Sequence, residues 1–265
     1  MNDESGAELV RVADRMADAA RRVVRPYFRA GVPIEDKGAS SFDPVTQADR
    51  AVERAMRQVL AEERPQDGIL GEEEAPVAGS TGLTWVIDPI DGTRAFISGM
   101  PTWGVLIALT DVSGPVLGVI DQPFMEERFH GRAGHASYTR GAEAPRPMVT
   151  RQTTDVADAV LFTTFPEIGT AEERVAFEAV RDRVRMVRYG TDCYGYALLA
   201  LGQIDLVIEA GLMPYDIQAP IAVVEAAGGV VTDWSGGPAH QGGRALAAAT
   251  PALHAAALEI LSDLI

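Results

Sequence analysis

From about residue 145 onward, the sequence alternates short β-branched runs with segments of helical periodicity. We predict strands at AVLFTT, VRMVRY, IDLVIE, GVVTDW and LAAAT, and helices at AEERVAFEAVRD, CYGYALLALG, DIQAPIAVVEAAGG and PALHAAALEILSDL. Strands that alternate with helices pack in layers, because the helices cover the faces of the sheet. We therefore expect this part of the chain to be a layered α/β structure.

The preceding part of the chain has a different pattern. Apolar residues recur at helical spacing over residues 9–24 and about 46–63, and short strands are predicted at TWVID, WGVLIALT and VLGVI. WGVLIALT is apolar almost throughout, which is typical of a central strand that is covered on both faces. We predict an α+β half at residues 1–147 and an α/β half at residues 148–265, sharing one interface.

The charge balance excludes several classes of partner. Lys and Arg total 23 against 38 Asp and Glu, so the formal charge of the 265-residue chain is −15. This charge opposes nucleic acids and anionic lipid surfaces, and no basic run reverses it locally. The acidic N-terminal segment does not resemble a secretory signal, and no apolar stretch approaches the roughly 20 residues of a membrane span. We expect a cytoplasmic protein that binds neither nucleic acid nor membrane.

The sequence richest in chemistry is the GEEE stretch at 71–74, followed by DPIDGT at 88–93. A predicted strand ends at Asp88, Pro89 bars its continuation, and Gly92 allows a tight turn that presents Asp88 with Asp91. Carboxylates together with an exposed carbonyl form a hard oxygen donor set, which suits Mg²⁺ or Mn²⁺ better than zinc. A solvated acidic turn is the simpler interpretation of this pattern by itself.

Two further acidic segments have a structural interpretation beside the functional one. Asp216 lies at the start of the helix predicted at DIQAPIAVVEAAGG, where it would cap the helix and remain able to bind a metal. The segment from Asp43 to Asp49 is similarly explained by a capped helix start. The sequence thus offers several carboxylates whose convergence would create a metal site.

The segments PVTQAD, GEE, WVIDPIDGT and YD…EAAGG, which occur in this order along the chain, resemble the inositol monophosphatase superfamily of Mg²⁺-dependent phosphatases over nearly the whole chain. The segments DGTRAFISGMPTWGVLIAL, GVIDQPF, RYGTDCYGYALLALGQIDLVIE and YDIQAP are most similar to its histidinol-phosphate phosphatase branch. The resemblance implies a layered α-β-α-β-α sandwich, two or three Mg²⁺ ions that Mn²⁺ would replace, and a homodimer.

The resemblance also assigns roles to individual residues. It implies that the metals are bound by Glu72, Asp88, the carbonyl of Ile90, Asp91 and Asp216. It further implies that Thr93 and Asp49 orient the attacking water together with Glu72, and that the amides of Gly92 and Thr93 hold the phosphate. Lys37, the only lysine of the chain, matches a lysine near the metals, although a solvated surface position explains it equally well.

The substrate beyond the phosphate would contact Gly190, Thr191, Asp192 and Glu209, again by resemblance. Asp192 stands where inositol-specific relatives have a small neutral residue, and a carboxylate there would pair with the ammonium group of histidinol phosphate. Asp192 would otherwise be the N-cap of the helix at CYGYALLALG. Arg94 would approach the phosphate or the imidazole, unless it faces solvent.

The sequence therefore predicts a phosphoric monoester hydrolase that converts L-histidinol phosphate and water into L-histidinol and phosphate, in histidine biosynthesis. An inositol-1-monophosphatase or a broad-specificity sugar phosphatase is the alternative within the same chemistry. A catalytically silent, metal-binding regulatory protein is the alternative outside it.

Overall fold

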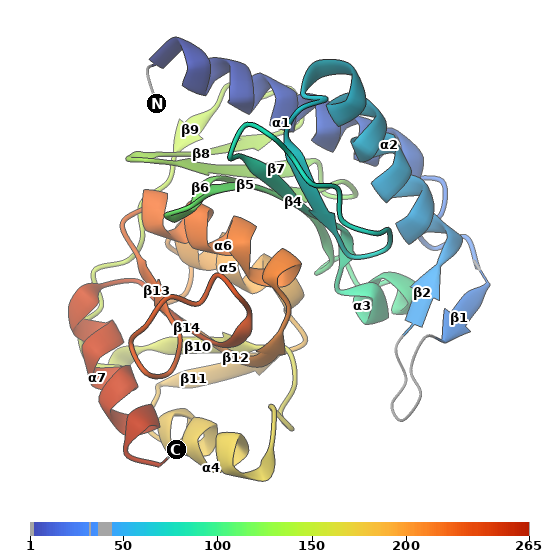
Figure 1. Ribbon diagram of the computed structural model, residues 1–265. Coiled ribbons are helices and arrows are strands. Elements are labelled where there is room, and N and C mark those ends of the chain that lie inside the picture. Colours follow the sequence, from blue (N-terminus) through green and yellow to red (C-terminus); the bar gives the residue numbers. More distant parts are fainter. Residues whose placement is uncertain (1–2, 32, 37–43, 265) are drawn as a thin grey trace.

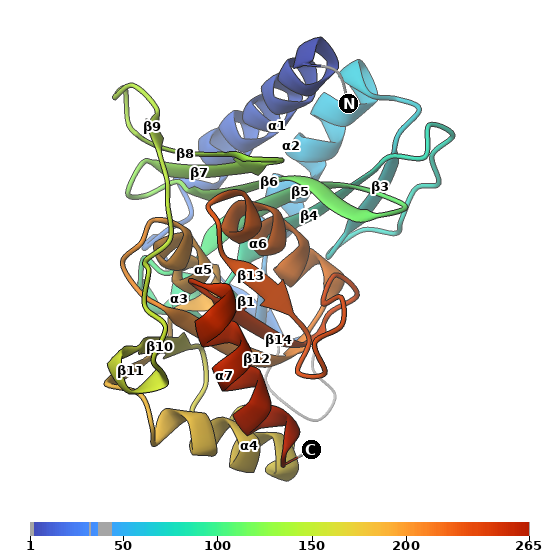
Figure 2. The ribbon, with the colours of Figure 1, turned by 90° about the vertical axis from the view of Figure 1, so that its left-hand side faces the viewer.

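A computed structural model describes residues 3–31, 33–36 and 44–264 of the chain (Figure 1). Lys37 and Asp43 lie outside the described residues. The elements form five layers, in which helices and sheets alternate as α-β-α-β-α (Figures 1 and 2). The layered fold that the sequence predicts is confirmed.

The first sheet has seven strands in the order β3-β4-β5-β6-β7-β8-β9. Strands β3 and β4 pair in parallel, and every other neighbouring pair is antiparallel. The strands are β3 (Gly68–Gly71), β4 (Thr84–Asp91), β5 (Gly104–Asp111), β6 (Gly114–Gln122), β7 (Glu127–Arg132), β8 (His135–Arg140) and β9 (Arg146–Pro147).

Two long amphipathic helices, α1 (Asp3–Val24) and α2 (Gln47–Glu63), form the first layer above this sheet (Figure 1). Their apolar residues recur at helical spacing and are buried on one side, Met16 in α1 and Met56 in α2 among them. Helix α2 begins after Thr46, whose hydroxyl accepts the backbone N–H of Ala48. This cap explains why the helix starts where the sequence predicts.

Strand β5 lies between β4 and β6 and is buried on both faces. Val105, Ile107 and Leu109 belong to the core beneath α1 and α2. Leu106 and Ala108 belong to the core on the opposite face, against α6. Full burial of each large aliphatic side chain contributes about 1.5–3 kcal/mol to folding. The predicted doubly covered strand is confirmed.

The middle layer consists of α5 (Asp192–Ala200) and α6 (Pro214–Ala226), which lie between the two sheets (Figure 2). Two glycines let α6 approach the first sheet closely. A Cβ atom on Gly118 or on Gly131 would overlap the carbonyl oxygen of Ala219 or Ala222 in α6. The carboxyl end of β4 lies near the N-terminus of α6, where Asp88, Asp91 and Asp216 meet.

The second sheet has five strands in the order β11-β10-β12-β14-β13, and α4 (Ala171–Arg181) and α7 (Pro251–Ser262) cover its outer face (Figure 1). Strand β10 pairs in parallel with β11 and β12, whereas β14 is antiparallel to its neighbours. The strands are β10 (Val160–Thr163), β11 (Met186–Tyr189), β12 (Leu206–Leu212), β13 (Val230–Thr232) and β14 (Gly243–Ala248).

Smaller elements complete the chain: α3 (Thr93–Ser98), the 3₁₀ turn at Val156–Asp158, and a hairpin of β1 (Ile34–Asp36) and β2 (Pro44–Thr46). The first sheet changes to the second between β9 and β10, and the division into two halves near residue 148 stays a prediction. Among the described residues, no helix is both long and apolar enough to cross a membrane.

Candidate metal and phosphate site

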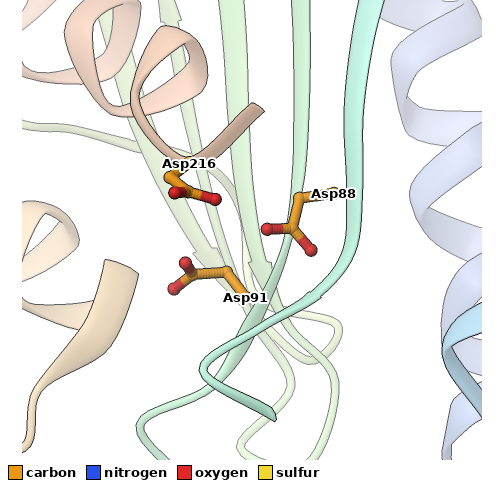
Figure 3. A group of neighbouring side chains, drawn as sticks. All are labelled: Asp88, Asp91 and Asp216. Carbon is orange, nitrogen blue, oxygen red and sulfur yellow. The ribbon is translucent and has the colours of Figure 1, made fainter. Parts of the chain in front are cut away.

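Three aspartates from two elements meet at the junction of the first sheet and the middle helices. Asp88 and Asp91 lie at the end of β4, and Asp216 lies in the first turn of α6 (Figure 3). One carboxylate oxygen from each lies within 4.8 Å of the others. Asp216 follows Asp88 by 128 positions and Asp91 by 125 positions, so residues far apart in the sequence form one acidic cluster.

An irregularity in β4 explains how Asp88 and Asp91 meet. Side chains three positions apart in a regular strand point to opposite faces. The pairing of β4 with β5 shifts register between Asp88 and Asp91, where Pro89 has no N–H to donate. The shift allows both carboxylates to turn toward Asp216, as Figure 3 shows.

Each carboxylate of the cluster is held by a backbone N–H. Asp88 Oδ1 accepts from Ile90 N at 3.0 Å. Asp91 Oδ2 accepts from Cys193 N at 2.7 Å, and Asp216 Oδ2 accepts from Met213 N at 2.7 Å. Backbone hydrogen bonds therefore fix the orientation of all three carboxylates. The predicted capping position of Asp216 at the start of α6 is confirmed.

Burial and mutual repulsion make the cluster unfavourable without a cation. Burial raises the pKa of Asp88 well above its usual range, and the charges of Glu72, Asp91 and Asp216 add to this rise. Burial and the charge of Asp216 likewise raise the pKa of Asp91, and burial raises the pKa of Asp216 to about 6. A divalent ion would reverse these effects, and three carboxylates are the hard ligands that Mg²⁺ prefers. The residues present fit a metal.

The acidic cluster forms one wall of a pocket of about 300 Å³. Glu72, which directly follows β3, lines this pocket but is not part of the 4.8 Å cluster. The predicted site residues that line it are Glu72, Asp88, Ile90, Asp91, Gly92, Thr93, Arg94, Asp192, Glu209 and Asp216. Gly190 and Thr191 are not among its lining residues, and neither is Asp49.

Asp49 has the capping position that the sequence offered as its simpler explanation. Its Oδ2 atom accepts the backbone N–H of Thr46 at 2.8 Å and the hydroxyl of Thr46 at 2.7 Å. The Asp49 side chain is buried, and its charge contributes to the raised pKa of Asp88. The paired role of Asp49 and Thr93 in orienting water stays a prediction. The hydroxyl of Thr93 donates to the Ile90 carbonyl at 3.1 Å.

Gly92 lies in the pocket between Asp91 of the acidic cluster and Asp192. It is the N-cap of α3 and has a φ of +80°, a conformation that glycine adopts without strain. A Cβ atom there would lie 2.7 Å from Cγ of Asp192. The turn therefore needs glycine for both its conformation and its contact with Asp192.

Asp192 does not cap its helix. Thr191 is the N-cap of α5 and makes no side-chain capping bond, while Asp192 is the first helical residue, with a φ of +45°. The interpretation of Asp192 as an N-cap is therefore wrong. Its Oδ2 atom instead accepts the hydroxyl of Thr102 at 2.9 Å, and burial raises its pKa.

The sequence did not identify the contacts that hold the outer part of the pocket. Thr164 donates its N–H and hydroxyl to Glu209 Oε1, at 2.9 and 2.6 Å, and burial raises the pKa of Glu209 to about 7. Arg94 lies over the ring of Phe165, 5.1 Å from its centre. The available signal was topological, because the parallel pairing of β10 with β12 brings Thr164, directly after β10, close to Glu209 within β12.

Comparisons with known proteins agree with this geometry. The model of the inositol monophosphatase family matches residues 6–265. The chloroplastic bifunctional phosphatase IMPL2 of Arabidopsis thaliana is 44% identical over 227 residues, which cover 85% of this chain and 64% of that protein. Histidinol-phosphatase of Mycobacterium tuberculosis is 35% identical over 235 residues, covering 88% of this chain and 90% of that protein.

A solved structure of an inositol monophosphatase from Zymomonas mobilis has a TM-score of 0.85 and 41% identity, covering 97% of this chain and 98% of that one. The chain belongs to the inositol monophosphatase family. Members of this family are metal-dependent phosphatases, and the acidic cluster of this chain could hold a metal ion. Relatives named for histidinol phosphate and for inositol phosphate both occur, so the family defines the chemistry more closely than the substrate.

Proposed function

We propose that this protein is a Mg²⁺-dependent histidinol-phosphate phosphatase that hydrolyses L-histidinol phosphate to L-histidinol and phosphate. The observation that carries the proposal is the presence of two further carboxylates, the partly buried Asp192 and the buried Glu209, in the pocket that holds the acidic cluster. One end of the pocket suits a metal and a phosphate, and the other suits a cation. Histidinol phosphate has an ammonium group, whereas inositol phosphate offers only hydroxyl groups.

At the phosphate end, Asp88, Asp91, Asp216, Glu72 and the Ile90 carbonyl are the groups proposed to hold the metal. Divalent cations there would lower the pKa of a bound water and neutralise the charge of the phosphate and leaving group. Two or three Mg²⁺ ions are proposed, with Mn²⁺ as a substitute.

The remaining groups at this end orient the reactants. The backbone amides of Gly92 and Thr93 are proposed to donate to the phosphate oxygens. Thr93, Asp49 and Glu72 are proposed to position the attacking water and accept its proton. Asp49 and Thr93 are already fixed by hydrogen bonds to Thr46 and to the Ile90 carbonyl, so their orientation requires little ordering when substrate binds.

At the outer end, Asp192 is the better candidate to bind the ammonium group. The hydroxyl of Thr102 orients its carboxylate, and Arg94 favours its ionised form. Glu209 Oε1 already accepts two hydrogen bonds from Thr164, and burial raises the pKa of Glu209 to about 7, so Glu209 contributes less than Asp192. Gly190 and Thr191, which do not line the pocket, would act by shaping the turn that presents Asp192.

The test is a phosphate-release assay on L-histidinol phosphate, inositol 1-phosphate and a set of sugar phosphates, with Mg²⁺ and with EDTA. We expect the highest kcat/KM for histidinol phosphate and no turnover in EDTA. A higher kcat/KM for inositol 1-phosphate, or similar values for many sugar phosphates, would replace the proposed substrate with one of the alternatives. Metal binding without hydrolysis of any ester would favour a silent regulatory protein.

A homodimer and a cytoplasmic location complete the proposal. The homodimer follows from the resemblance to the family, and the cytoplasmic location is proposed together with it. Light scattering of the purified protein would measure the first, and fractionation of cells would test the second.

A further inference from the structure

Glu53, on the buried face of α2, contacts the backbone of the GEEE segment. Its side chain has no exposed surface. Oε2 accepts the backbone N–H of Glu73 at 2.7 Å, and Oε1 accepts the backbone N–H of Glu74 at 3.1 Å. One carboxylate therefore fixes two consecutive peptide groups that lie 20 and 21 residues further along the chain.

Arg57, one turn later on α2, completes this contact. Its Nε atom donates to Glu53 Oε1 at 2.8 Å, and its Nη2 atom donates to the carbonyl oxygen of Glu74 at 2.9 Å. The Glu53–Arg57 pair thus forms hydrogen bonds with two backbone N–H groups and one backbone carbonyl of the turn after β3. The buried charge of Glu53 is matched by a guanidinium whose side chain is 12% exposed. Such charge-assisted bonds are stronger than neutral ones.

Gly71 makes this close approach possible. A Cβ atom at Gly71 would overlap Glu53 Oε1 and would lie 2.6 Å from its Cδ atom. Gly71 does not adopt a positive φ. The glycine at the start of GEEE is therefore required for space and not for backbone conformation. Glu72 lies between Gly71 and the two peptide N–H groups that Glu53 holds.

We propose that Glu53 is a positioning residue for Glu72, which it holds at the metal pocket through the backbone of residues 71–74. Glu72 lines the pocket, and its charge raises the pKa of Asp88. Glu72 follows β3, however, whereas the aspartate cluster is formed by residues of β4 and α6. Its placement relative to that cluster depends on the turn after β3. Helix α2 therefore contributes to the proposed metal site through Glu53. This inference rests on the proposed metal-binding role of Glu72.

The test is Glu53→Gln, with metal binding to the metal-free protein measured by titration calorimetry with Mn²⁺. Glutamine has the same shape but places an amide N–H₂ against one of the two peptide N–H groups, so the turn loses one hydrogen bond and shifts. We expect the Kd for the weakest Mn²⁺ site to rise about 10-fold, and the Mg²⁺ concentration for half-maximal activity to rise in parallel. The KM for substrate at saturating Mg²⁺ should change less than 2-fold.

Glu63→Gln is the matched control. Glu63 lies on the same helix and forms ion pairs with Arg11 and Arg15, without contact to the turn. Its substitution should lower the melting temperature without changing the Mn²⁺ isotherm. Unchanged Mn²⁺ binding in a folded Glu53→Gln variant would overturn the positioning role. Failure of the unaltered protein to bind Mn²⁺ would instead overturn the proposed metal site itself.

Gly71→Ala provides a second variant if Glu53→Gln does not fold. The added methyl group would displace the Glu53 carboxylate, but the variant would retain every charged residue of the protein, Glu53 and Glu72 included. We expect the same rise in Kd for Mn²⁺, about 10-fold. A folded Gly71→Ala protein with unaltered Mn²⁺ binding would contradict the proposal independently of Glu53→Gln.

Discussion

The carboxylate of Asp91 accepts the backbone N–H of Cys193, 102 residues further along the chain, at 2.7 Å. Asp91 belongs to the end of β4 in the first sheet, and Cys193 belongs to the first turn of α5 in the middle layer. The bond supplies an acceptor at the N-terminus of α5, whose own N-cap Thr191 makes no side-chain capping bond. Asp192, the residue before Cys193, lies beside Gly92, so this bond links the acidic cluster to the outer part of the pocket.

The stability of the metal-free protein should fall as the pH rises from about 4 to about 7. Folding raises the pKa of Asp216 from 3.8 to about 6 and that of Glu209 from 4.5 to about 7. The folded state therefore holds protons that the unfolded chain has released, and this stabilisation is lost as the pH passes the folded pKa. Calorimetric melting in EDTA should show the decline. Saturating Mg²⁺ should reduce it, and identical pH profiles with and without Mg²⁺ would contradict the account.

Asp216→Asn should make the metal-free protein more stable at pH 8. The substitution removes one partly buried like charge while its side-chain oxygen still accepts the N–H of Met213. The shift in the pKa of Asp216 corresponds to up to about 3 kcal/mol in the free energy of unfolding. Urea unfolding in EDTA measures this gain. The same variant should lose the stabilisation by Mg²⁺, and a variant that is less stable in EDTA would show that repulsion in the cluster is unimportant.

Asp192→Asn should raise the KM for L-histidinol phosphate about 10-fold, which corresponds to about 1.4 kcal/mol. The KM for inositol 1-phosphate should change little, because that substrate has no ammonium group. Glu167→Gln is a suitable control, since Glu167 also lines the pocket but is exposed, where solvent screens its charge. Equal KM values for the Asp192 variant and the unaltered protein would remove Asp192 from substrate recognition.

Gly92→Ala should abolish most activity and lower stability more than Gly82→Ala does. Both glycines have a φ of +80°, so both substitutions introduce a backbone strain of about 1–2 kcal/mol. Only at Gly92 would the new Cβ atom meet another side chain, that of Asp192. Measurements of kcat and of the melting temperature for both variants separate the two contributions. Equal losses in the two proteins would show that the contact between Gly92 and Asp192 has no consequence.

The local sequence pattern correctly predicted helices and strands whose buried faces consist of apolar residues. Helix α2 has its predicted start because Thr46 is a side-chain cap, and β5 was recognised because residues 104–109, buried on both faces, are all apolar. Strands β7 and β8, with sequences ERFHGR and HASYTR, were missed. Strand β7 contains Arg128, which forms ion pairs with Asp14 of α1 and Asp121 of β6, and such partners cannot be identified from the local sequence.

The candidate site likewise includes features that short sequence segments reveal and features that they do not. The resemblance identified the acidic residues that the structure brings together, because those residues occur in short segments such as DPIDGT. The register shift in β4, the bond from Cys193 to Asp91 and the contact of Glu53 with the GEEE turn all depend on chain segments that meet only after folding. The capping interpretation of Asp192 was wrong for the same reason, since Asp91 from another element supplies the acceptor at that helix end.

The central claim is that Asp88, Asp91 and Asp216 hold a divalent cation. Crystals grown with Mn²⁺ and measured for anomalous scattering test it most directly, because the signal locates the ion without reference to activity. We predict an anomalous peak between the three carboxylates, with a further peak near Glu72 if a second site is filled. The absence of any peak among these carboxylates, under solution conditions in which Mn²⁺ supports phosphate release, would contradict the account.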